Sequence, residues 1–208
     1  MSTAARIADT ALRLFNQKGY ASTTLTEIAA EIGISQGNLT YHFPTKLDLA
    51  NHLSEQVRAH GERRRAAHVP GPIEDDYVES LRNAMELTWH SGFLMRDRGI
   101  FEPVDAVVPP SPILVAALQE RRNLIGRIDA DGLFRADADV DLDVLARALW
   151  ILSRHWTDHL REMEARDEIA WADMQRGIEH HFAVLMPMLT ASGRRRFGAA
   201  LERANAAA

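Results

Sequence analysis

The sequence predicts an all-α protein, and three observations support this. Apolar residues recur at intervals of three and four over most of the 208 residues, which is the spacing of one helix face. No segment shows the strict alternation that is typical of a half-buried strand. Proline and glycine interrupt the helical pattern, most clearly in HVPGP at residues 68–72. We expect a small helical domain at residues 1–46, a connecting helix that extends to about residue 67, and a larger helical domain within residues 47–208.

The first predicted helix spans residues 3–18. Gly19 ends it, because glycine adopts backbone conformations that other residues avoid. The apolar residues share one face and consist of Ile7, Ala8, Ala11, Leu12, Leu14 and Phe15. We expect this helix to support the following two from behind.

Two short helices joined by a tight turn are predicted within residues 23–46. Thr24 is followed three residues later by Glu27, a capping box that begins the first helix. Gly33 ends this helix, because it accepts a left-handed backbone without a steric penalty. Ser35 is placed to cap the second helix through its side-chain oxygen.

The second of these helices, residues 36–43, has a face of short uncharged polar side chains. Such a face suits the major groove of DNA, where amide groups donate and accept hydrogen bonds at base edges. Gln36 and Asn38 are the predicted base contacts, and Gly37 allows a close approach. Tyr41, His42 and Lys46 lie further along, where they are expected to meet phosphates. The predicted DNA contacts are Thr24, Gln36, Gly37, Asn38, Thr40, Tyr41, His42 and Lys46.

These residues carry a resemblance to a known family. The stretch GYASTTLTEIAAEIGISQGNLTYHFPTKLDL is similar to the DNA-binding segment of TetR-family transcriptional regulators, and the resemblance covers residues 7–53. The elements G-Y-x-x-T-T, I-A-x-x-x-G-I-S-x-G-x-L and K-x-x-L occur together, in order and at the family's spacing. The chain departs from the common pattern at Thr40, where an aromatic residue is frequent, and at Pro44. The resemblance implies an all-helical, dimeric regulator with an effector site in its larger domain.

Three further helices are predicted before residue 132. The first spans residues 45–67, the second residues 73–92 and the third residues 113–131, with Gly132 at its end. Four prolines interrupt the segment between the second and third, residues 93–112, and prevent a long helix there.

Two long helices of similar pattern are predicted near the carboxyl end, from residue 139 or 141 to 164 and from residue 167 to 186. Their apolar stripes form a seam that another helix pair can pack against. The resemblance implies a four-helix dimer interface here; the alternative is that both helices pack only within one protomer. The predicted dimer contacts are Leu145, Leu149, Leu152, Trp171, Met174, Ile178, Phe182 and Leu185.

The resemblance also implies a pocket for a small effector whose binding opposes DNA binding. Large apolar residues of the body would favour an apolar or aromatic molecule, although core packing explains each of them equally well. The predicted pocket residues are Met85, Trp89, Phe93, Phe101, Trp150 and Trp156.

The charge is distributed unevenly along the chain. Residues 1–66 hold eight Lys or Arg and six Asp or Glu, a net charge of +2. The remainder of the chain carries a net charge of −7, and the two parts add up to the total of −5. This asymmetry places a polyanionic partner at the amino-terminal domain. Double-stranded DNA is therefore the expected partner, bound as a palindromic operator by a homodimer.

Several other functions are disfavoured. The chain has no cysteine, which excludes disulfides, thiol nucleophiles and thiolate metal sites. No signal peptide and no apolar run of about 18 residues is present, so we expect a cytoplasmic protein without membrane contact or cofactor. We expect a regulator, most often a repressor, rather than an enzyme. Two alternatives are an architectural DNA binder without an effector and a helical metalloenzyme using His155, His159 and Glu162.

Overall fold

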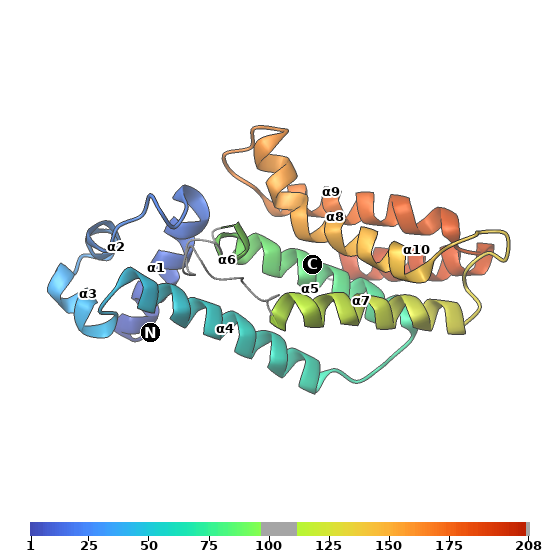
Figure 1. Cartoon of the computed structure of the whole chain (residues 1–208), viewed down its shortest axis with the longest axis horizontal. Coiled ribbons are helices and arrows are strands. Elements are labelled where there is room, and N and C mark those ends of the chain that lie inside the picture. Colours follow the sequence, from blue (N-terminus) through green and yellow to red (C-terminus); the bar gives the residue numbers. More distant parts are fainter. Residues whose placement is uncertain (97–111, 207–208) are drawn as a thin grey trace, which may run out of the picture. The chain divides into compact units, whose positions relative to one another are not determined.

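The computed structural model describes residues 1–96 and 112–206, and it confirms the all-α prediction (Figure 1). These residues form two compact units. The described part of the amino-terminal unit comprises residues 1–68 and 90–96, and that of the body comprises residues 69–89 and 112–206. In the part of the chain that the structure describes, β pairing is limited to one isolated bridge between Phe134 and Leu189.

The amino-terminal unit consists of five helices around one apolar core in its described part. Five residues of α1 to α4 are completely buried there: Ile7, Phe15, Ile28, Leu39 and Leu49. The elements are α1 (Thr3–Lys18), α2 (Leu25–Glu31), α3 (Gln36–His42), α4 (Lys46–Ala67) and α6 (Gly92–Arg96). The predicted bounds of the first helix are confirmed, as are the helices expected at residues 36–43 and 45–67 within one residue at each end.

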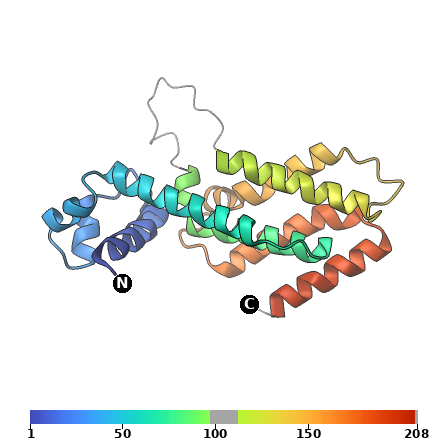
Figure 2. The same ribbon diagram turned by 90° about the horizontal axis from the view of Figure 1, so that it is seen from below.

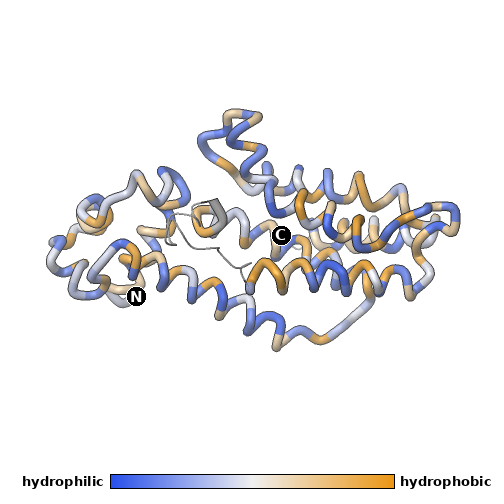
Figure 3. The backbone as a smooth tube through the Cα atoms, viewed as in Figure 1, coloured by the Kyte–Doolittle hydropathy of each residue, from blue (hydrophilic) through white to orange (hydrophobic). Residues whose placement is uncertain are grey.

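The body is a bundle in which α5, α7, α8 and α9 run roughly along a common direction (Figure 1, Figure 2). Apolar and polar residues both occur along these helices (Figure 3), and the buried apolar residues form a single cluster. The elements are α5 (Ile73–His90), α7 (Pro112–Ala130), α8 (Leu142–Glu162), α9 (Trp171–Leu185), the 3-10 turn η2 (Met186–Met188) and α10 (Ala191–Ala206). Among the described residues, no helix is both long enough and apolar enough to cross a bilayer.

The predicted start of the last long helix at residue 167 was wrong. Residues 163–170 form a loop in which Ala165 has a positive φ of 53°, and α9 begins only at Trp171. Asp173 fixes this start, because its carboxylate accepts a hydrogen bond of 3.0 Å from the Ala170 N–H. The contact made by Asp173 thus sets the first residue of α9. The sequence alone did not distinguish Asp173 from Asp167, which is equally acidic.

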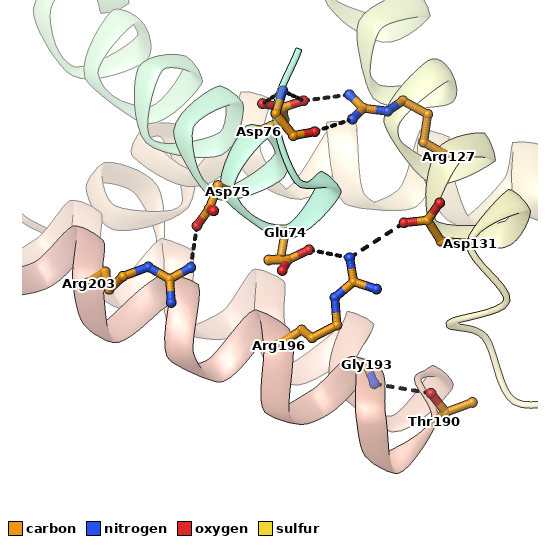
Figure 4. A network of polar contacts seen from close by, with 10 residues as sticks. Glu74, Asp75, Asp76, Arg127, Asp131, Thr190, Gly193, Arg196 and Arg203 are labelled. Carbon is orange, nitrogen blue, oxygen red and sulfur yellow. Dashed lines mark hydrogen bonds and ion pairs between the residues drawn. The ribbon is translucent and has the colours of Figure 1, made fainter.

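Three arginines of α7 and α10 form ion pairs with the acidic first turn of α5 (Figure 4). Arg127 of α7 lies 2.7 Å from Asp76, and Arg203 of α10 lies 2.5 Å from Asp75. Arg196, also of α10, lies 2.7 Å from Glu74 and 3.5 Å from Asp131 of the turn after α7. The tail of the chain is therefore tied to the body by charge as well as by the buried Phe197.

The Arg196–Glu74 pair predicts a pH-dependent stability. The hydrogen bond from Arg196 lowers the pKa of Glu74, so the pair stabilises the fold above the ordinary pKa of about 4.5 and loses this effect as the pH falls through the lowered value. We expect Arg196→Met to lower the midpoint of thermal unfolding by about 2–4 °C at pH 7 and by progressively less as the pH falls through the lowered pKa of Glu74. A series of thermal unfolding curves from pH 7 downward measures this, with Arg195→Met as the exposed control. A loss that stays the same over the whole series would contradict the assignment.

Candidate DNA-binding surface

The turn between α2 and α3 is fixed by side-chain caps at both helix starts. The Thr24 hydroxyl accepts from the Glu27 N–H at 3.1 Å, and the Ser35 hydroxyl accepts from the Asn38 N–H at 3.1 Å, as predicted. Gly33 between them has φ +71°, the left-handed conformation that favours glycine. The local sequence therefore specifies how α3 is oriented relative to α2.

α3 presents one polar face to solvent while its other side is anchored. Leu39 is completely buried in the amino-terminal core. Gln36, Gly37 and Asn38 are exposed, and 83% of Tyr41 is accessible. Packing within the protein does not account for a tyrosine and two amides that are exposed on one helix face. Such a face suits a helix that enters a groove of DNA.

Several of the predicted contacts have partners within the unit. The Thr40 hydroxyl donates to the backbone carbonyls of Gln36 at 3.1 Å and Gly37 at 3.2 Å. The Gln36 side-chain oxygen accepts from Thr26 at 2.9 Å, and the ring of Tyr41 lies 5.3 Å from that of His42. Thr26 was not predicted as part of this surface, yet it orients the Gln36 amide.

Lys46 has a structural role that sequence analysis missed. Its ammonium donates to the carbonyls of Tyr20 at 2.9 Å and Thr23 at 2.8 Å, and it lies 4.4 Å from the centre of the Tyr20 ring. These contacts join the start of α4 to the turn before α2 (residues 19–24). Contact between Lys46 and a phosphate therefore stays a prediction, and it has to coexist with these backbone contacts.

Cations of α1 hold α2 in place. The Arg6 guanidinium donates to the Ile32 carbonyl at 2.9 Å, Arg13 lies 2.7 Å from Glu31, and Lys18 pairs with Glu27. The excess positive charge of this unit is thus partly used to orient the helix that precedes the turn.

The predicted effector residues do not gather around one cavity. Phe93 lies in the core of the amino-terminal unit, 5.1 Å from the ring of Phe15, so its assignment to the body was wrong. Met85 and Trp156 are buried core residues of the body, and Trp89 and Trp150 are half-buried. Phe101 lies outside the described residues. A groove of about 400 Å³ between α5 and α10 is lined by other residues, including Glu79, Arg82 and Arg203.

The predicted dimer contacts are mostly internal. α8 and α9 pack against each other, and the structure buries six of the eight residues in the body's own core, which leaves Leu152 and Trp171 half-buried. Side chains buried in this way cannot form the surface of a dimer. The outer faces of the same helices carry exposed apolar residues instead: Val144 is 61% accessible, Ile151 48% and Val184 39%. The six internal residues are Leu145, Leu149, Met174, Ile178, Phe182 and Leu185.

The proposed metal ligands are engaged separately. His155 lies 3.1 Å from Asp158, whereas His159 lies 3.5 Å from Glu164. Glu162 is exposed, and the described residues contain no group of three His, Asp or Glu that could hold a metal ion. The two histidines therefore have separate acidic partners, Asp158 within α8 and Glu164 in the loop that follows it.

Two capped helices joined by a glycine turn, with an exposed uncharged second helix, define a helix-turn-helix DNA-binding unit. Comparison with protein-family models agrees: residues 7–53 match the model described as bacterial regulatory proteins, tetR family, and residues 112–197 match one described as bacterial transcriptional repressor. The chain belongs to the TetR family of transcriptional regulators. The relatives found are regulators and not enzymes.

Curated relatives support this assignment, and solved structures share the fold. The chain is 30% identical over 153 residues to the transcriptional regulator CymR of Pseudomonas putida, which covers 67% of this chain and 71% of CymR. It is 38% identical over 89 residues to AcrR of Shigella flexneri, a match that spans 41% of each. A TetR-family regulator from Marinobacter aquaeolei has a TM-score of 0.73 at 22% identity and 98% coverage of both chains. A gamma-butyrolactone receptor has a TM-score of 0.69 at 21% identity, covering 96% of this chain and 94% of the receptor.

Proposed function

We propose that this chain is a dimeric repressor that binds a palindromic operator through α3 and is released from it by a small molecule bound in the body. The exposed face of Gln36, Gly37, Asn38 and Tyr41 carries this proposal. A single face of seven helical residues reads only a few base pairs, so discrimination within a genome requires two copies related by a two-fold axis.

We assign dimerisation to the outer faces of α8 and α9. Val144, Ile151 and Val184 are large apolar side chains that a monomer would leave in water. A partner with the same face would cover them, as an isologous interface requires. Val144→Glu with Ile151→Glu is the variant pair that would test the position of the interface.

A DNA-binding assay with base-contact variants tests the proposal. Purified protein should retard a palindromic fragment from the region upstream of its own gene. Gln36→Ala and Asn38→Ala are expected to weaken binding to that fragment about 5- to 100-fold and to reduce discrimination between base variants at one position of each half-site. Gel retardation at fixed salt measures both effects.

The control is Gln119→Ala, which removes an exposed amide from α7 in the body and should leave DNA affinity unchanged. If all three variants bound as tightly as the parent protein and with the same base preference, α3 would not be the element that contacts bases.

A further inference from the structure

A buried guanidinium without sufficient partners lies in the body. Arg121 of α7 is only 4% accessible, and neither its Nε nor its Nη1 has a hydrogen-bond partner. The guanidinium carbon lies 4.7 Å from the centre of the Tyr77 ring, which is a cation–π contact. Because buried charges are normally paired and hydrogen-bonded, this site requires an explanation.

The polar groups beside Arg121 form a neutral, self-contained chain. Ser153 donates to the Leu149 carbonyl at 3.0 Å, so its oxygen accepts from His181 Nδ1 at 3.0 Å. The remaining nitrogen of His181, Nε2, then accepts from the Tyr77 hydroxyl at 2.7 Å. Burial and the Arg121 charge both lower the pKa of His181, which keeps the imidazole neutral, and burial raises the pKa of Tyr77.

Two acidic side chains of α7 and α8 have partners other than Arg121. Glu120, next to Arg121 in the sequence, accepts from Ser80 at 2.6 Å, and Asp143 pairs with Arg122 and Arg147. None of the ion pairs recorded between described residues includes Arg121. Within the described part of the chain, Arg121 therefore carries one positive charge with donors for an anion and without a paired carboxylate.

We propose that Arg121 binds the acidic group of the effector, and that the effector is an organic monocarboxylate with an apolar body. A single guanidinium balances one negative charge, which favours a carboxylate over a phosphate dianion. The Tyr77 ring beside Arg121 lies 6.2 Å from that of Phe182 and 5.6 Å from that of Phe197, so a group bound to Arg121 would have apolar surroundings. The role as effector rests on the proposed function, whereas binding of the carboxylate at Arg121 does not.

Paired acids and amides test the binding site directly. The probes are acetate, octanoate and benzoate, with acetamide, octanamide and benzamide as neutral counterparts of similar shape. Thermal unfolding and tryptophan fluorescence of the full-length protein should show tighter binding of at least one acid than of its amide. Arg121→Met is expected to weaken binding of that acid at least about 30-fold and to leave the amide unchanged.

The stability of the variant without any probe provides a second measurement. Arg121→Met removes an unpaired buried charge, so its unfolding midpoint should equal or exceed that of the parent protein. Arg122→Met, which loses a partly exposed pair with Asp143, is the control and should bind the acid normally. If no acid binds better than its amide, or if Arg121→Met lowers the midpoint and leaves acid binding unchanged, the proposal is wrong.

Gel retardation separates this inference from the proposed function. A failure to bind operator DNA without any probe would overturn the proposed function and leave the carboxylate site standing. Normal DNA binding with no acid binding would overturn the carboxylate site alone. An acid that binds at Arg121 but does not reduce DNA affinity would show that the site is not the effector site.

Discussion

Gly177→Ala is expected to lower the free energy of unfolding by about 3 kcal/mol. A Cβ at this buried position of α9 would lie 2.3 Å from the Met85 Cε atom and 2.6 Å from the Trp156 ring. Met85 can move its terminal methyl group. The indole cannot move as easily, because its N–H donates to the Asp173 carbonyl at 2.8 Å and its ring is packed in the core.

Urea and thermal unfolding measure this effect, with an expected fall of the midpoint by roughly 6–12 °C. Gly126→Ala is the matched control, because a Cβ in the middle of α7 meets nothing within 4 Å. There the gain in helix propensity should raise stability by about 0.5–1 kcal/mol. Equal effects of the two substitutions would contradict close packing of α9 against Met85 and Trp156.

Gly37→Leu is expected to reduce operator affinity at least about 100-fold, or about 2.7 kcal/mol, without loss of folded stability. In the free protein a Cβ here approaches only the Ser35 hydroxyl, at 4.0 Å, so the leucine projects into solvent. On DNA it would project into the space between α3 and the groove. Gel retardation together with thermal unfolding separates the two effects.

Gly198→Leu places the same side chain on α10, at another helical glycine with open space around it. DNA affinity should stay within about two-fold of the parent protein in this control, since α10 belongs to the body. Undiminished DNA binding by Gly37→Leu would show that α3 does not enter the groove closely.

Local signals in the sequence predicted the helix-turn-helix almost completely. Thr24, Gly33 and Ser35 act over three or four residues, so their effect is visible without the rest of the fold. The start of α9 depends on whether Asp167 or Asp173 lies in its first turn, and the hydrogen bond that Asp173 accepts from the Ala170 N–H decides it. Sequence patterns locate caps well where only one candidate is present.

Features that depend on tertiary packing were not predictable in the same way. An apolar stripe identifies a buried face but not what covers it, which is why Leu149 and Phe182 were assigned to a dimer and lie in the protomer core. Phe93 was assigned to the wrong unit because α6 continues the chain directly after α5. One signal for Arg121 was available: it occupies the apolar stripe of Leu124, Ile125 and Ile128, where a charged residue is exceptional.

The contacts of Lys46 have a consequence for the kinetics of operator binding. Lys46 is the first residue of α4, and its side chain binds the turn before α2. The two ends of the segment that contains α2 and α3 are therefore held together. A segment constrained in this way has little backbone freedom left to lose on association. We therefore expect operator binding to proceed in one kinetic phase, at a rate set by diffusion and charge, with no slow ordering step after the encounter.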